Sequence, residues 1–535
     1  MAGCIKLENL YFNCKNLSDM EARNFAFYNV GSSDIGVVLT IGKDVTRISN
    51  YAFNPYSNSN YAPKFKYVKY EDGNALTEIG SYAFAYVQLD SVTVPETMEL
   101  IDTSAFYNCK SLLKVCNLST LDIEMGAKTH GYVAYYALLV TQDPNEDIDF
   151  SSAGGFIFGF VDEEPYLLQC TLTDKEKIVL PESFEYTENG ETTTYSQYTI
   201  KESCFSNFVN LVKLVANNSV IAIESYAFSN CTNLTTIENL SNLITIPEFA
   251  FFNCEKLMSV DLSNVLIVKD SAFRNAGITS ANLSKARTVE SYAFYGCKRL
   301  ETVIWSSSIN VIPAYTFTNS GIKNLTLTDN VTEIGKFAFN GCSQIQEINI
   351  PDSVTTIREK AFQGCSGAKT LVLGKNLKTI EASGFNGLTS VTSITYNAIN
   401  MDNFTNSNYI FANLGTTQGT TMVISDEVTH IPSYLLCPNY GSYSSQISSP
   451  VRVTNLTIGK NVQTIGANAF HGLYWLNTLN YNAISVADTT SIHNSRIYEA
   501  SLIPPSFSTL KLNNKAGHQL LSYYERMYAE YKDIF

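Results

Sequence analysis

Residues 338–365 read AFNGCSQIQEINIPDSVTTIREKAFQGC, and the Ala-Phe-x-Gly-Cys motif that opens this stretch returns at its end. A phenylalanine at the same position recurs every 21 to 23 residues through the middle of the chain, at Phe205, Phe228, Phe251, Phe273, Phe294, Phe317, Phe339, Phe362 and Phe385. A fixed period of this length is the signature of a solenoid, in which each period forms one turn of a coil.

Within one period, the apolar residues predict where the chain is extended and where it turns. Ile348 and Ile350 alternate with polar residues, so a short strand is expected to point both side chains inward. Pro351 ends this strand, 354–357 form a second extended stretch, and 361–362 are expected on a helical or 3₁₀ turn. Stacked turns would bury these residues against their neighbours.

These residues resemble the BspA-like leucine-rich repeats, whose unit reads roughly L-x-x-I-x-I-P-x-x-V-x-x-I-x-x-x-A-F-x-x-C. The resemblance covers residues 202–396 and continues at 459–476 and at Phe27, Phe53, Phe84 and Phe106. It implies a mostly β solenoid, a right-handed coil of short parallel strands with short helical or 3₁₀ turns. It also implies a cell-surface or secreted protein, because the family is associated with adhesion to host, matrix and microbial partners.

The repeat pattern predicts one solenoid body over residues 1–515, because solenoids grow without a central core. Segments near 117–200 and 396–450 depart from the period and are interpreted as inserts, the first a pair of strands and the second a longer turn. Residues 516–535 carry Leu and Tyr at spacings of three and four, which predicts an amphipathic helix. The helix is expected to cap the last turn or to anchor the chain to a partner.

Composition excludes some partners. The chain has 36 Lys and Arg against 50 Asp and Glu, a formal charge of -14, and no basic cluster, so nucleic acid is not expected as a partner. No apolar run approaches the ~18 residues of a membrane span. The first residues lack the charged and apolar regions of a signal peptide, which leaves a cytoplasmic or virion-associated location open.

Seven of the twelve cysteines occupy one repeat position, at Cys14, Cys109, Cys231, Cys254, Cys297, Cys342 and Cys365. Side chains stacked in such a column point the same way, which is poor geometry for a disulfide. Buried thiols that act as small apolar groups are expected.

No catalytic motif, cofactor motif or metal-ligand spacing was found, so the chain is expected to be neither an enzyme nor a cofactor carrier. Asp143, Asn145, Asp147 and Asp149 alternate as in the opening of a calcium loop. However, Ile148 stands where such a loop needs Gly, and Gly154 stands where it needs Glu. A solvated loop is the favoured interpretation.

In each turn, the strand positions that alternate with the core positions should form one exposed surface. Counted five and seven residues after the cysteine position, the candidate binding residues are Ser259, Asp261, Ser280, Asn282, Thr302, Ile304, Asn324, Thr326, Glu347 and Asn349. This strip is small, polar and nearly neutral, which suits a protein or a glycan. Such residues also cover β-surfaces that bind nothing.

Aromatic residues outside the repeat positions are further candidates, because exposed Tyr and Trp are enriched at interfaces. We selected Tyr440, Tyr443 and Trp475. Trp305 takes the place of Ile350 in its own repeat, so it is expected in the core.

Two functions remain open from the sequence. The first is a non-enzymatic recognition or adhesion scaffold that binds a protein or glycan partner through the solenoid face or its inserts. The second is a structural component of a larger assembly, such as a surface appendage or a viral particle, attached through the C-terminal helix. The sequence identifies neither the partner nor the oligomeric state.

Overall fold

The computed structural model describes residues 4–15, 17–21, 26–27, 30–31, 36–54, 63–137, 139–146, 151–188, 190–405, 407–437, 450–466, 469–470, 473, 475–483 and 509–512. The chain divides into two compact units. Unit 1 comprises Met1–Glu163, Leu167–Thr171 and Glu185–Thr193, and unit 2 comprises Glu164–Tyr166, Leu172–Phe184 and Thr194–Phe535. One continuous body over 1–515 therefore stays a prediction, and the helix expected at 516–535 lies outside the described residues.

In unit 1, parallel strands contributed by successive turns lie side by side. The longer sheet has the order β1 (Asn9–Phe12), β2 (Val37–Ile41), β4 (Lys64–Tyr70), β6 (Gln88–Val94), β8 (Lys114–Asn117) and β9 (Leu139–Thr141). A shorter sheet contains β3 (Arg47–Ile48), β5 (Glu78–Ile79) and β7 (Leu100–Ile101). The 3₁₀ helix η2 (His130–Tyr132) also lies in this unit.

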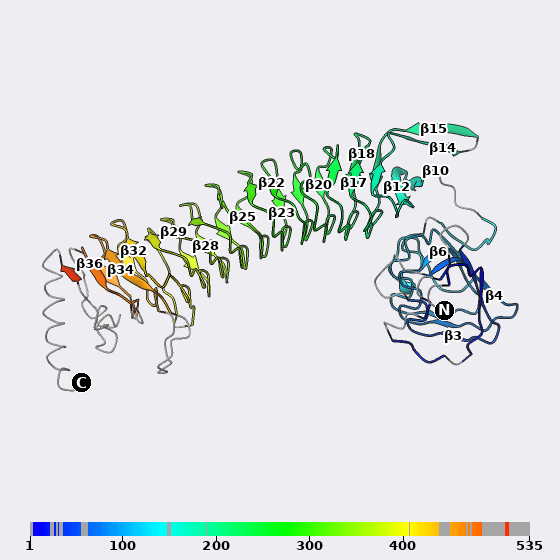
Figure 1. Ribbon diagram of the computed structural model, residues 1–535, viewed down its shortest axis with the longest axis horizontal. Coiled ribbons are helices and arrows are strands. Elements are labelled where there is room, and N and C mark those ends of the chain that lie inside the picture. Colours follow the sequence, from blue (N-terminus) through cyan, green and yellow to red (C-terminus); the bar gives the residue numbers. More distant parts are fainter. Residues whose placement is uncertain are drawn as a thin grey trace. The chain divides into compact units, whose positions relative to one another are not determined.

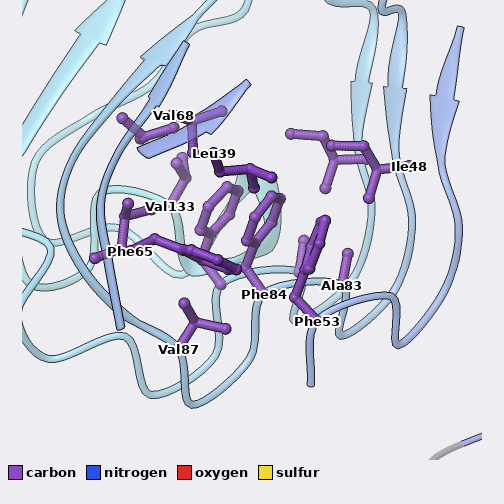
Figure 2. Packing of buried hydrophobic residues seen from close by; sticks show 14 of the residues in the cluster. Leu39, Ile48, Phe53, Phe65, Val68, Ala83, Phe84, Val87 and Val133 are labelled. Carbon is purple, nitrogen blue, oxygen red and sulfur yellow. The ribbon is translucent and has the colours of Figure 1, made fainter. Parts of the chain in front are cut away.

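The core of unit 1 is a column of phenylalanines with aliphatic residues around it. Figure 2 shows Phe53, Phe65 and Phe84 with Leu39 and Val68 in this interior. The Phe53 and Phe84 rings stack with centroids 5.0 Å apart, and Phe65 meets Phe53 edge-on at 5.4 Å. The repeat predicted from isolated phenylalanines near the N-terminus is therefore present.

The first predicted insert is built of strands, as expected. Strands β10 (Ser151–Ala153) and β11 (Phe156–Val161) pair antiparallel, and β12 (Glu164–Cys170) follows. Strands β14 (Phe184–Glu188) and β15 (Glu191–Tyr195) form a separate two-stranded sheet, and β16 (Tyr198–Ile200) pairs with β18 (Val220–Ile223).

In unit 2, most turns contribute a first strand and a short second strand, and Figure 1 shows these turns following one another from β17 to β36. The first strands form three parallel sheets. They are β13 (Lys177–Val179), β17 (Lys213–Val215) and β19 (Thr236–Glu238); then β22 (Ser280–Asn282) and β24 (Thr302–Ile304); then β27 (Glu347–Asn349), β29 (Thr370–Leu373), β31 (Ser393–Tyr396), β32 (Thr420–Ile424), β34 (Val453–Ile458), β36 (Thr478–Tyr481) and β37 (Thr509–Leu512).

The second strands pair in the same order. They are β20 (Thr245–Ile246), β21 (Ile267–Val268) and β23 (Thr288–Val289); then β25 (Val311–Ile312), β26 (Glu333–Ile334), β28 (Thr356–Ile357) and β30 (Thr379–Ile380); then β33 (His430–Ile431) and β35 (Thr464–Ile465). Because β31 pairs directly with β32, the connection between them belongs to a longer turn of the same coil; residues 438–449 of the second predicted insert lie outside the described residues.

The repeating phenylalanines of unit 2 form an unbroken buried stack, here called the inner ladder. It consists of Phe205, Phe228, Phe251, Phe273, Phe294, Phe317, Phe339, Phe362, Phe385 and Phe411, with neighbouring ring centroids 5.2 to 5.7 Å apart. Trp305 lies in the core as predicted, edge-on to Phe317 at 5.5 Å. Ile348 and Ile350 point inward, also as predicted.

The turn that carries each phenylalanine is more irregular than a 3₁₀ helix. Its amides alternate between two kinds of partner: Ala227 N–H donates to Glu224 O three residues back, whereas Phe228 N–H donates to Ala250 O in the next turn. Tyr226 and Asn230 have φ values of 59° each. The expected 3₁₀-type bonds are therefore present, but alternate bonds tie each turn to the next and satisfy every buried amide of the segment.

Most of the cysteine column is buried, and each of the buried thiols donates to a backbone carbonyl. The Sγ of Cys342 donates to Phe317 O at 2.9 Å, and the Sγ of Cys365 donates to Phe339 O at 3.2 Å. All twelve cysteines are free. Burial raises the pKa of the Cys297 thiol, which keeps it protonated and inert.

Cys14 is an exception to the prediction, because it is exposed. Within the described residues, no phenylalanine carbonyl of a preceding turn accepts its thiol hydrogen, and no such turn covers it.

Candidate binding face

The exposed side chains of the first strands of unit 2 form the surface here called the strand face. Its first row is fixed by the parallel register, in which each member pairs with the equivalent residue of the next turn. The row runs through Ser280, Thr302, Asn324, Glu347, Thr370, Ser393 and Thr421. Four of the predicted residues are therefore consecutive neighbours, one strand spacing of ~4.8 Å apart.

The second row lies two residues further along each strand. Asn282 pairs with Ile304, and further along Asn349, Val372, Thr395 and Val423 pair in sequence. The Ile304 side chain is 55% exposed and that of Val423 is 38% exposed. The strand face thus combines small polar side chains with isolated apolar ones, which is the mixed character of a non-obligate interface.

The two rows are least regular at the turns that lack a full strand. Ser259 and Asp261 are exposed, but their turn has no first strand, and the Asp261 carboxylate accepts the Ser263 N–H at 2.9 Å. Asn324 makes only isolated bridges to its neighbours, and Thr326 is exposed beside it. Backbone hydrogen bonds of Met258 and of Lys323 still tie these two turns to the turns on either side.

Charged side chains beside the rows are paired across turns. Lys213 Nζ lies 2.6 Å from Glu238 Oε1, and Lys323 Nζ lies 2.6 Å from Glu301 Oε1. Exposed pairs of this kind contribute only about 0–1 kcal/mol each to stability. They leave the strand face close to neutral, as the sequence predicts, so an extended polar partner suits it better than a highly charged one.

Of the three aromatic candidates, only Trp475 lies in the described part of the chain. Trp475 is 37% exposed, and the Arg452 guanidinium lies 5.6 Å from its ring centroid, so a cation already occupies one side of the indole. Tyr440 and Tyr443 lie outside the described residues.

Sequence reasoning missed a second aromatic stack on unit 2, here called the outer ladder. It occupies the position two residues before each inner phenylalanine and includes Tyr226, Phe249, Tyr292, Tyr315 and Phe337. The Tyr292 and Tyr315 centroids are 4.6 Å apart, and these side chains are half-buried. The available signal was the recurring Tyr-Ala-Phe or Phe-Ala-Phe triplet.

Arg274 extends this aromatic surface. Its guanidinium lies 4.9 Å from the Tyr295 ring centroid and 5.8 Å from that of Tyr292, and its Nε is buried without a hydrogen-bond partner in the described part of the chain. Contact with ring faces replaces part of the lost hydration of the cation. Arg274 thus packs against Tyr292 of the outer ladder and the neighbouring Tyr295.

Metal-binding geometry is absent from the described residues, where no group of three His, Cys, Asp or Glu side chains could hold an ion. In the acidic run that resembles the opening of a calcium loop, the Asp143 carboxylate accepts the Asn145 N–H at 2.9 Å, which forms a local turn. Asp147 and Asp149 lie outside the described residues. Among the described helices, none has the length and apolar character of a membrane span.

Comparison with protein families gives one match, to the BspA type leucine-rich repeat region. The model of this family matches residues 2–113, 60–135, 177–301, 287–418 and 443–513, which together cover most of the chain. A search of curated proteins gave no significant match.

Several solved structures of bacterial proteins are similar to this chain. A leucine-rich repeat protein of Bacteroides ovatus is 17% identical, with a TM-score of 0.47 over 67% of this chain and 98% of that one. A leucine-rich cell surface protein of Faecalibacterium prausnitzii is 17% identical, with a TM-score of 0.34 over 70% of this chain and 97% of that one. The pneumococcal vaccine antigen PcpA is 15% identical, with a TM-score of 0.26 over 89% of this chain and 79% of that one.

Proposed function

The chain belongs to the BspA type leucine-rich repeat family, and from this premise we propose that it is a non-enzymatic recognition scaffold, which binds a protein or glycan partner through the strand face of unit 2. Repeat folds of this kind serve many partners, so the fold alone does not select one. The proposal includes a location at the cell surface, in line with the adhesive role associated with the family.

One observation carries the proposal: the parallel register aligns exposed residues of successive turns in a continuous first row, with a second row beside part of it. From Ser280 to Thr421 the first row follows the strand pairing without a gap. Equivalent side chains repeat at ~4.8 Å, so a partner can add contacts turn by turn. The core beneath is rigid, and little conformational entropy would be lost when a partner binds.

The surface also supports binding rather than catalysis. Thr302, Asn324 and Glu347 are exposed and lie in an open row, whereas a catalytic site needs groups that converge in a water-excluding cleft. The pKa of the buried Cys342 thiol is raised to about 11, so the cysteine column offers no activated nucleophile at neutral pH.

The experiment uses the full chain on an array of glycans and extracellular proteins. The variant Thr302→Arg with Asn324→Arg places two long cations in the first row without touching the core. We expect saturable binding to at least one array member, weakened tenfold or more in this variant. No binding to any member, or equal binding by both proteins, would contradict the proposal.

A matched control carries Val311→Arg with Thr332→Arg. Both control residues are exposed and lie in the same turns, but Val311 is on the second strand β25 and Thr332 directly precedes the second strand β26, away from the strand face. The control is expected to bind as the unmodified chain does. A control as weak as the test variant would show that added charge, and not the strand face, explains the loss.

A further inference from the structure

Unit 1 contains a groove that the proposed function does not use. It has a volume of about 660 Å³, and its lining comes from β4, β6 and the turns that follow these two strands. This volume falls within the range of about 300–1,000 Å³ that is common for small-ligand sites. We infer that this groove binds a short neutral oligosaccharide.

The walls of the groove are held in place by bonds of their own. The Glu71 carboxylate accepts the Lys43 N–H at 2.9 Å, and the Asn74 side-chain oxygen accepts the Thr97 hydroxyl at 3.2 Å. The buried Tyr70 hydroxyl donates to Thr93 O at 2.8 Å and ties β4 to β6. Because both turns are fixed before a ligand arrives, binding costs little ordering entropy.

A second set of polar groups lines the same groove and remains available to a ligand. The carboxylates of Asp72 and Glu96 and the hydroxyl of Ser91 form no hydrogen bond or ion pair within the described residues. They come from three places: the turn after β4, the turn after β6, and β6 itself. Carboxylates that accept hydroxyl groups form strong, charge-assisted hydrogen bonds, which suits a ligand rich in hydroxyls.

Tyr67 adds an aromatic side chain at the base of this set. A bulge at Lys66 shifts the pairing, so that Tyr67 lies opposite Val38 on one side and Ser91 on the other. Bulges of this kind commonly re-aim a side chain beside a binding site. The Lys69 ammonium lies 5.2 Å from the Tyr67 ring centroid and holds the ring in position.

The charges of the lining exclude other ligand classes. Lys69 is the one cation in the lining, against the carboxylates of Glu71, Asp72 and Glu96, so anions such as phosphate are disfavoured. No set of three metal ligands occurs among the described residues, and much of the lining is polar, which disfavours a bare metal or an apolar ligand. A neutral polyhydroxyl chain donates hydrogen bonds to the free carboxylates and brings no further charge into the groove.

The test is calorimetric titration of the full chain with cellotriose, maltotriose and N-acetylated chitotriose, with spermidine as a cationic probe. We expect one trisaccharide to bind with one-to-one stoichiometry. Asp72→Ala and Tyr67→Ala should each lower the affinity for this trisaccharide tenfold or more, because both side chains line the groove. The inference is overturned if no trisaccharide saturates, if spermidine alone binds, or if both variants bind as the unmodified chain does.

Tyr11→Ala and Glu8→Ala are the matched controls. Tyr11 is 65% exposed on β1 of the same sheet, Glu8 is exposed just before that strand, and neither lines the groove. Both variants should keep the full affinity; an equal loss in them would place the sugar elsewhere on the sheet. Since the Thr302 and Asn324 substitutions lie in unit 2, this test and the test of the strand face can fail independently.

Discussion

The inner and outer ladders of unit 2 have the same stacking geometry but different surroundings. Phe317 stacks on Phe339 with centroids 5.4 Å apart and rings 11° from parallel, and it is fully buried. Tyr315, two residues earlier, stacks on Phe337 at 4.9 Å and 9°, but it is half-buried. The outer stack is as close as the inner one, although water reaches it.

The difference shows which physical term selects the residue type. The inner position is Phe in consecutive turns from Phe205 to Phe411, whereas the outer position also accepts Ser271, Lys360 and Ser383. Stacking alone is worth only about 0.5–1.5 kcal/mol beyond burial. Burial of a whole ring is worth more, so only the inner column must be apolar at every turn.

The largest effect is expected from Phe317→Ala. The change removes a ring that stacks between Phe294 and Phe339 and meets Trp305 edge-on, and it leaves a cavity in a core that is continuous on both sides. Loss of a buried Phe side chain costs about 3–5 kcal/mol. Urea denaturation, monitored by Trp fluorescence, would measure this loss in the free energy of unfolding. A loss below 1 kcal/mol would mean that the inner ladder does not hold the coil together.

A smaller loss, of about 1 kcal/mol, is expected from Tyr315→Ala, because only half-buried stacking is removed. Tyr315 has a φ of 60°, a conformation that costs a non-glycine residue roughly 1–2 kcal/mol. Tyr315→Gly should therefore be less destabilising than Tyr315→Ala under the same denaturation conditions. If the glycine variant is the less stable of the two, left-handed strain does not contribute at this position.

Much of the inner architecture could be predicted from the sequence. The outer ladder has only the partial signal of the recurring triplet, and the division into units has none. Phe339 and Ile348 are readable because a buried column must be apolar in every turn. The positive φ values of Tyr226 and Lys360 cannot be recognised in the sequence. Tyr and Lys rarely adopt a positive φ, and the residue type at this position changes from turn to turn. The exposure of Cys14 could not be predicted either, because the burial of a cysteine in this column depends on the turn that packs against it.

The candidate site divides in the same way. The row from Ser280 to Glu347 follows from the repeat period, because parallel pairing of equal turns fixes its register. The groove of unit 1 does not follow from the repeat period, because it depends on the bulge at Lys66 and on the free carboxylates of two neighbouring turns. Periodicity predicts surfaces that repeat but not a site that occurs at one turn.

Tyr396→Phe is expected to change stability in the opposite direction. Tyr396 occupies a buried position, but its side chain ends in a polar hydroxyl. The Tyr396 hydroxyl is buried and has no hydrogen-bond partner in the described part of the chain. Removing an unsatisfied buried hydroxyl should leave stability unchanged or raise it by up to about 1 kcal/mol. A variant destabilised by more than this amount in urea denaturation would show that the hydroxyl has a partner.

The smallest effect concerns Tyr481, whose buried hydroxyl likewise has no hydrogen-bond partner among the described residues. Burial raises its pKa to about 12 from the usual 10.0. The folded state therefore favours the neutral phenol, and the resulting stability is present below pH 10 and is lost as the pH rises from there through the folded pKa. Tyr481→Phe should flatten the decline in stability between these pH values relative to the unmodified chain; identical slopes would contradict the shift.

The most direct test of recognition through the strand face is an arginine scan of the first row, with a partner identified on the array. Ser280→Arg, Asn324→Arg, Ser393→Arg and Thr421→Arg sample exposed positions along it, and Val311→Arg is the control beside the second strands. The account predicts that affinity falls tenfold or more at adjacent row positions and stays unchanged in the control. Full affinity in all four row variants, or an equal loss in Val311→Arg, would contradict it.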